Sequence, residues 1–284
     1  MTIKVLLAEA ASALSDAGVP DPVAQARDLL GIATGKEKVF IIAHPEHVPS
    51  KTEISRFSEL VRRRASREPF QQIAGHQEFF GLDFLVTPDV MIPRPETELI
   101  VERGIGLLSK IATPSICEVG TGSGCIVVSL LHSLPEATAV GLEVSSPARE
   151  VTLANARSNG VADRLDLRES DVFSALVPEE QFDLIVSNPP YVPLEDIDSL
   201  QPEVRDHEPL VALTDGSTGL TIIERLVNEA PDHLQKGGHL LLEIGFDQSR
   251  RVLEMFKPRI WASAEAFADL QGIPRMIDAS LAVG

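Results

Sequence analysis

Residues 118–125 read EVGTGSGC, and this glycine-rich stretch decides the fold. The apolar run SICEV (115–119) predicts a buried strand before it, and CIVVSLLHSL (125–134) predicts a helix after it. Glycine at three alternate positions lets the backbone turn sharply, and it lets a ligand approach where a Cβ atom would collide. A strand, a glycine loop and a helix in this order predict an α/β sheet that binds a ligand at its edge.

The alternation of strands and helices continues along the chain. ATAVGLEV and FDLIVS predict further strands, and SPAREVTLANARSNG predicts a helix that follows the first of them. STGLTIIERLVNEAPDHLQ (217–235) predicts an amphipathic helix stopped by Gly237-Gly238, and HLLLEIG (239–245) predicts another buried strand. Strands separated by helices of this length indicate right-handed crossovers and a parallel sheet covered on both faces.

The rest of the chain divides into two shorter parts. Residues 1–75 read as short helices, including one through ISRFSELVRRRAS (54–66), and predict a small N-terminal helical domain. Residues 76–90 change to the period of a β-hairpin and predict a linker. Residues 91–284 form the α/β domain, which opens with MIPRPETELI, where two prolines prevent regular structure before a helix begins near Glu96.

Charge and composition exclude several classes of protein. The chain of 284 residues has a net charge of −17, and residues 76–284 hold 15 Lys+Arg against 33 Asp+Glu. A body this acidic repels a phosphate backbone, so we expect no direct binding of nucleic acid. The one dense basic cluster, Arg62, Arg63, Arg64 and Arg67, is interpreted as a solvated helix face or as a dock for an acidic partner.

The sequence also favours a particular compartment. No apolar run approaches the ~20 residues that span a bilayer, and the N-terminus lacks the pattern of a secretory signal, so we expect a cytoplasmic protein without a membrane partner. Two cysteines cannot build a disulfide framework, and the seven histidines do not cluster with other ligands, so no metal is expected.

The glycine loop favours a nucleoside cofactor without phosphates. The dinucleotide fingerprint G-x-G-x-x-G places its third glycine where Cys125 stands here, which favours S-adenosylmethionine over a pyrophosphate. Glu143 follows the second strand, 23 residues after Gly120, where its carboxylate can accept hydrogen bonds from both ribose hydroxyls. Asp171, Val172 and Phe173 follow a third predicted strand and are candidates to bracket an adenine ring.

The stretch SNPPY (187–191) predicts a clamp for a planar amide or amine. Asn188 stands at the carboxyl end of the strand FDLIVS, the edge where open α/β sheets bind ligands. Its side-chain oxygen and the backbone carbonyl of Pro189 are two acceptors for the two hydrogens of an NH2 group. Pro189 and Pro190 hold the backbone rigid, and Tyr191 can stack on the planar group.

Four ordered motifs, EVGTGSG, NPPY, IPRPETE (92–98) and DLQGIPR (269–275), resemble the PrmC/HemK family of protein-(glutamine-N5) methyltransferases over nearly the whole chain. The resemblance implies a Rossmann-like class I S-adenosylmethionine-dependent methyltransferase domain with a mostly parallel seven-stranded sheet. It implies methyl transfer to the glutamine of the GGQ tripeptide in class-1 peptide-chain release factors, with the N-terminal domain as their docking site. By resemblance, glutamine binds at Asn188–Tyr191, and the cofactor is held by Asn188 and by the residues Gly120, Thr121, Gly122, Ser123, Gly124, Glu143, Asp171 and Val172.

Two departures from the family pattern concern the cofactor. The ribose-binding acid is more often Asp than the Glu143 of this chain, and an aromatic residue is common where Val172 stands.

Two other functions compete with the main hypothesis. The clamp can also grip the exocyclic NH2 of a flipped base, as in an adenine-N6 or guanine-N2 methyltransferase. A non-catalytic adaptor that binds release factor through its helical domain is the alternative outside enzymes.

Overall fold

The computed structural model describes residues 1–283, which form two compact units. The first unit consists of Met1–His76 together with Gln201–His207. The second consists of Gln77–Leu200 and the residues from Glu208 onward. No helix in this described part of the chain is long and apolar enough to span a membrane.

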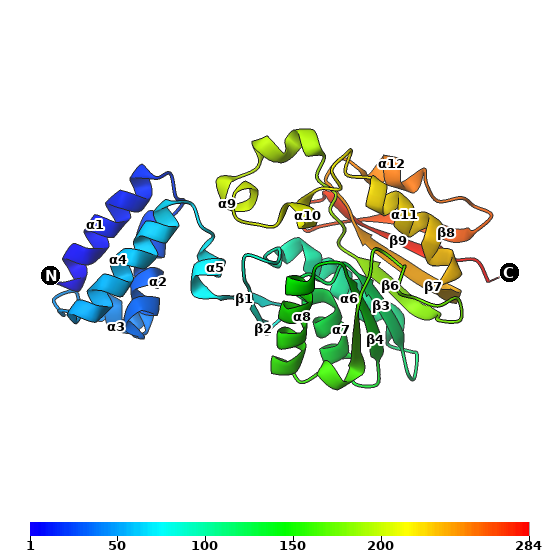
Figure 1. Cartoon of the computed structure of the whole chain (residues 1–284), viewed down its shortest axis with the longest axis horizontal. Coiled ribbons are helices and arrows are strands. Elements are labelled where there is room, and N and C mark those ends of the chain that lie inside the picture. The colour runs from blue at the N-terminus through cyan, green and yellow to red at the C-terminus, as the bar shows by residue number, and fades with distance from the viewer. Residues whose placement is uncertain (284) are drawn as a thin grey trace. The chain divides into compact units, whose positions relative to one another are not determined.

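The first unit contains a bundle of helices around one apolar core, drawn in blue and cyan in Figure 1. These helices are α1 (Ile3–Asp16), α2 (Pro22–Thr34), α3 (Lys38–Ala43), α4 (Lys51–Ala65) and α5 (Phe70–Ala74), and the unit also includes the short α9 (Pro202–Arg205). Ser50 and Glu53 form a capping box that starts α4 three residues before the predicted apolar stretch, because each side chain satisfies a backbone N–H of the first turn. The fully buried Leu14, Leu29 and Leu30 lie in this core.

The segment Gln201–His207 groups with the helical bundle although it is distant in sequence. Glu203 accepts hydrogen bonds from Arg64 at 2.9 Å and from Arg67 at 2.6 Å. Gln72 donates its amide to the carbonyl oxygen of His207 at 3.1 Å. Burial alone raises the pKa of Glu203, but the hydrogen bonds from Arg67 and Arg64 outweigh it and lower the pKa to about 2.

We expect Glu203→Gln to lower the free energy of unfolding by about 2 kcal/mol at pH 7, because two arginines lose a charged partner in a mostly buried site. The pKa of Glu203 is lower in the folded state, so its stabilising effect is complete above pH 4.5 and is lost as the pH falls toward 2. The melting temperatures of parent and variant should therefore converge below pH 4.5. Glu59→Gln, which breaks the exposed pair with Arg62, is the control and should leave the melting temperature unchanged. A difference that stays constant down to pH 3 would contradict this assignment.

The second unit is built on a seven-stranded sheet in the order β5-β4-β3-β6-β7-β9-β8. The first five of these pair in parallel, and β9 pairs antiparallel with β7 and β8. The predicted mostly parallel seven-stranded sheet is thereby confirmed. The strands are β3 (Ser115–Val119), β4 (Thr138–Glu143), β5 (Leu165–Glu169), β6 (Phe182–Ser187), β7 (Leu234–Glu243), β8 (Trp261–Ala268) and β9 (Pro274–Leu281).

Helices cover both faces of this sheet (Figure 1), because the strands β3, β6 and β7 place apolar side chains alternately on the two sides. One apolar cluster joins the sheet to α6 (Glu98–Leu108), α7 (Cys125–Ser133) and α8 (Ser146–Ser158). The cluster on the opposite face includes residues of α11 (Thr221–Glu229) and α12 (Ser249–Leu253). The short α10 (Leu210–Leu213) lies outside both clusters, as Leu210 is 54% exposed.

A separate hairpin of β1 (His76–Phe79) and β2 (Leu82–Leu85) precedes the sheet. Phe79 and Phe84 are fully buried in the cluster of α6 and α7, with their ring centroids 6.0 Å apart. Asn155 of α8 accepts a hydrogen bond from the backbone N–H of Leu85 and donates one to its carbonyl oxygen. The hairpin is therefore hydrogen-bonded to α8, and the same Asn155 side chain also donates to the glycine loop at Ser123.

The bounds predicted for the helix at 217–235 were wrong at both ends, because the structure has α11 at Thr221–Glu229. Asp215 accepts hydrogen bonds from the backbone N–H groups of Ser217, Gly219 and Thr221, which holds residues 215–220 in a loop and delays α11 to Thr221. The helix ends at Glu229, and Pro231 lies in a short 3₁₀ turn (Ala230–Asp232).

Gly237 and Gly238 do not stop a helix but lie inside β7. Gly237 has φ +77°, and a Cβ atom on Gly238 would lie 3.1 Å from the carbonyl oxygens of Phe182 and Asp183. The pairing of β6 with β7 shifts register at this point, so the glycines permit an irregularity in the sheet.

Candidate active site

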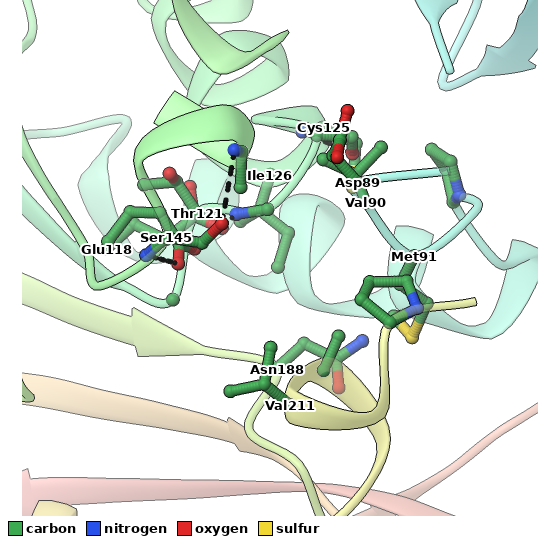
Figure 2. Close-up of a pocket in the computed structure, with 18 of the residues that line it drawn as sticks. Asp89, Val90, Met91, Glu118, Thr121, Cys125, Ile126, Ser145, Asn188 and Val211 are labelled. Atoms are coloured by element: carbon green, nitrogen blue, oxygen red, sulfur yellow. Dashed lines mark hydrogen bonds between the residues drawn. The ribbon is translucent and has the colours of Figure 1, made fainter. Parts of the chain in front are cut away.

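A pocket lies at the carboxyl ends of β3, β4 and β6, the edge where the sequence analysis expected a ligand. Figure 2 shows Asn188 and Val211 across the pocket from Thr121 and Ser145. Six of the predicted site residues line it: Gly120, Thr121, Gly122, Ser123, Glu143 and Asn188.

The glycine loop leaves room for a ligand at its first two glycines. Gly120 and Gly122 have φ +76° and +53°, a conformation that favours glycine, and no atom lies within 4 Å of a Cβ built on either. Gly124 differs, because its Cβ would lie 2.9 Å from the methyl group of Thr152 on α8. Gly124 does not line the pocket and instead permits close packing between the loop and α8.

Glu143 lines the pocket and binds two backbone N–H groups beside it. Its two carboxylate oxygens accept hydrogen bonds from the backbone N–H groups of Gly122 at 2.9 Å and Ser145 at 2.8 Å. A carboxylate offers about four acceptor positions, so two remain for a ligand. The residue thus joins the glycine loop to the start of α8 and also faces the space where a diol can bind.

Two buried polar residues of α8, which the sequence analysis did not single out, hold the glycine loop in place. The hydroxyl of Thr152 donates to the carbonyl oxygen of Gly122 at 2.8 Å, and it lies 2.9 Å from the hydroxyl of Thr121. The amide of Asn155 donates to the carbonyl oxygen of Ser123 at 2.9 Å. Both side chains are completely buried, so these hydrogen bonds stabilise the loop without competition from water.

Glu118 was predicted only as part of the motif, and the structure gives it a distinct environment. It lines the pocket, is 1% exposed, and accepts a hydrogen bond from the backbone N–H of Val127 at 2.9 Å. Burial raises the pKa of Glu118 well above its usual range, and the charge of Glu143 adds to the shift. A buried carboxyl with a raised pKa gains most from a cationic ligand, which would favour its ionised form.

The structure does not bring Asp171, Val172 and Phe173 into the pocket. Asp171 is largely exposed and forms an ion pair with Arg225 at 2.8 Å. Val172 and Phe173 are buried in the apolar cluster on the α11 side of the sheet. Their contact with adenine stays a prediction.

Asn188 is oriented by neighbours that come from distant parts of the chain. Its side-chain amide donates to the hydroxyl of Thr97 at 3.3 Å, and Thr97 donates to the carboxylate of Glu243 at 2.7 Å. None of the described residues donates a hydrogen bond to the Asn188 side-chain oxygen, and none to the carbonyl oxygen of Pro189. Of the two acceptors predicted for the clamp, only the Asn188 oxygen belongs to a residue that lines the pocket.

The remaining residues of the SNPPY stretch support the clamp from behind. Pro189 is buried and Pro190 partly buried, and neither lines the pocket. The ring of Tyr191 packs against the apolar cluster on the α11 side, and its hydroxyl donates to Glu243 at 3.1 Å. Burial raises the pKa of Tyr191 well above its usual range, and the charge of Glu243 adds to this, so the hydroxyl stays protonated.

The fold is that of the class I S-adenosylmethionine-dependent methyltransferases. Residues 100–200 match the family model of the methyltransferase small domain. The hMettl16 catalytic domain in complex with MAT2A 3'UTR hairpin 6 is similar in structure, with a TM-score of 0.59, 15% identity and 82% of each chain covered. A methyltransferase from Pyrococcus furiosus has a TM-score of 0.53 at 20% identity, covering 78% of this chain and 98% of its own. At these identities the likeness shows the fold alone.

The sequence comparisons identify the family. Residues 5–75 match the model of the PrmC N-terminal domain. The chain is 38% identical over 277 residues to the release factor glutamine methyltransferase of Koribacter versatilis, with 98% of both chains covered. It is 40% identical over 276 residues to that of Geobacter sulfurreducens, covering 97% of this chain and 95% of the relative. The chain therefore belongs to the family of release factor glutamine methyltransferases, which confirms the resemblance drawn from its motifs.

Proposed function

We propose that this protein transfers a methyl group from S-adenosylmethionine to the side-chain nitrogen of the glutamine in the GGQ tripeptide of class-1 peptide-chain release factors. One observation carries the proposal. Asn188 lines a pocket walled by the glycine loop and turns its side-chain NH2 to Thr97, in a chain that matches release factor glutamine methyltransferases over nearly its full length.

The pocket fits the cofactor on its own chemistry. Gly120 and Gly122 leave open space above the loop, which suits the close approach of a nucleoside. Glu143 has two acceptor positions left for the ribose hydroxyls, and Glu118 supplies a buried carboxyl for the cationic end of the molecule. When bound, S-adenosylmethionine supplies an activated methyl group on a positively charged sulfur.

The chain's own residues position the acceptor. The Asn188 side-chain oxygen and the Pro189 carbonyl each accept one hydrogen of the glutamine NH2, which fixes the direction of its nitrogen. An amide nitrogen is a weak nucleophile because its lone pair is delocalised into the carbonyl group. Catalysis therefore rests mainly on alignment, an effect worth up to ~7–11 kcal/mol when the geometry is right.

Charge favours a protein substrate over a nucleic acid. Arg62, Arg63, Arg64 and Arg67, the dense basic cluster, are each paired with a glutamate of the same helical unit. Three glutamates thus offset most of the positive charge that a phosphate backbone would need, and the α/β unit carries the acidic excess. We assign docking of the release factor to the helical domain of residues 1–75, supported by its match to the PrmC N-terminal domain, and place the activity in the cytoplasm with its substrate.

Incubation with labelled S-adenosylmethionine tests the function. Purified release factor should acquire one methyl group, located by mass spectrometry on the GGQ glutamine. The control is the same release factor with that glutamine replaced by alanine, which should stay unlabelled. Transfer to ribosomal RNA or DNA with none to release factor would contradict the proposal and favour the nucleic-acid alternative.

A further inference from the structure

A buried chain of hydrogen bonds connects three sequence motifs behind the acceptor site. It runs from Asn188 to Thr97 at 3.3 Å, from Thr97 to Glu243 at 2.7 Å, and from Tyr191 to Glu243 at 3.1 Å. Thr97 is 1% exposed and Glu243 is 3% exposed. Both lie in stretches, IPRPETE and HLLLEIG, to which the proposed function assigns no task.

The donors in this chain can point only one way. Thr97 donates its single hydroxyl hydrogen to one side-chain oxygen of Glu243, and the hydroxyl of Tyr191 donates to the other. The Thr97 oxygen is then left as an acceptor, and of the two ends of the Asn188 amide only the NH2 can donate to it. Burial raises the pKa of Glu243, and the hydrogen bonds from Thr97 and Tyr191 only partly offset this shift.

We propose that Thr97, held by Glu243, is a positioning residue that fixes which end of the Asn188 amide faces the acceptor, and so makes the site selective for an amide over a carboxylate. The inference rests on the proposed function and adds a residue to it. With its NH2 turned toward Thr97, Asn188 presents its oxygen to the substrate. A glutamine NH2 donates to that oxygen, whereas a glutamate oxygen would face it without a hydrogen between them.

Without the Thr97 hydroxyl, the Asn188 amide is free to rotate by 180°. The rotated amide presents its NH2 to the acceptor, which repels a glutamine NH2 and donates to a glutamate carboxylate. Loss of Thr97 should therefore change the preference between the two acceptors, not only the rate. If Thr97 had a merely structural role, its loss would weaken binding of the glutamine form and of the glutamate form of the release factor to the same extent.

The experiment compares Thr97→Val, which keeps the shape and removes the hydroxyl, with Thr97→Ser, which keeps the hydroxyl. Two probes are used: release factor, and release factor with its GGQ glutamine replaced by glutamate as a competitive inhibitor. For the Val variant we expect kcat to fall about 30-fold and the ratio of Ki for the glutamate form to KM for the glutamine form to fall at least tenfold. The Ser variant should keep the parent ratio within about twofold.

Thr97→Ala provides a second test that introduces no new contact at this buried position. It should show the same loss of discrimination, with the melting temperature recorded for each variant. An unchanged ratio in Thr97→Val and Thr97→Ala would overturn the inference, even if kcat falls. Failure of the parent enzyme to methylate the glutamine would instead overturn the proposed function, so the two failures are distinguishable.

Discussion

Asn188→Ala is expected to lower kcat for methyl transfer by about 10²–10³-fold while the Kd for S-adenosylmethionine stays within about threefold. The side-chain oxygen of Asn188 is one of the two acceptors that align the glutamine nitrogen, and loss of one preorganised polar contact at a reacting group has an effect of this size. The glycine loop, Glu143 and Glu118 remain intact in the variant, so the cofactor keeps its proposed contacts.

Single-turnover transfer of labelled methyl groups and calorimetric titration with the cofactor measure the two quantities separately. Asn228→Ala is the matched control, because Asn228 is an exposed asparagine on α11. It should behave as the parent in both assays. Methylation of release factor by Asn188→Ala at the parental rate would remove Asn188 from the acceptor site.

Gly219→Ala should lower the free energy of unfolding by about 3 kcal/mol and reduce methyl transfer at least as strongly as Thr97→Val. Gly219 has φ +72°, and a Cβ atom there would lie 2.0 Å from the carbonyl oxygen of Tyr191 and 2.7 Å from its carbonyl carbon. Both contacts are with backbone, so the chain itself must move, and this backbone directly follows the two prolines of the clamp. The same carbonyl oxygen accepts a hydrogen bond from Gln248 at 2.9 Å, which would also be disturbed.

Gly216→Ala separates the effect of contact from that of conformation. Gly216 has a similar φ of +74° in the same loop, but no atom lies within 4 Å of its Cβ position. Only the conformational cost of about 1 kcal/mol is expected there, with methyl transfer nearly unchanged. Equal losses in the two variants, measured by denaturant unfolding and by kcat, would show that close packing against Tyr191 does not shape the site.

Sequence reasoning succeeded where the signal is local. The strands β3, β4 and β6 and the helices α7 and α8 follow from apolar periodicity within each segment, and the parallel sheet follows from their alternation. The loop between β3 and α7 was predicted because glycines let the backbone turn sharply, and Gly120, Gly122 and Gly124 all have positive φ. The pocket at the carboxyl ends of the strands and the place of Asn188 in it follow from the same topology.

It failed at the boundaries of α11, which depend on the local hydrogen bonds of Asp215 and on Pro231. It failed at Gly238 because the cause is distant in sequence: a Cβ atom there would lie 3.1 Å from the carbonyl oxygens of Phe182 and Asp183 on β6. Glu243 could have been suspected as an acid inside an apolar strand, since a buried charge requires partners. The partners themselves could not be read from the sequence.

The sequence by itself determined the strands and helices from β3 to β6, the glycine loop and the strand end at which Asn188 stands, because each depends on neighbours within about 20 residues. Only the tertiary structure decided which way the Asn188 amide faces, since Thr97 and Glu243 lie far from it along the chain and hydrogen bonds act over about 3 Å. It likewise decided that Gly124 packs against Thr152 and that Tyr191 donates a hydrogen bond to Glu243, because side-chain contacts depend on which elements the fold brings together.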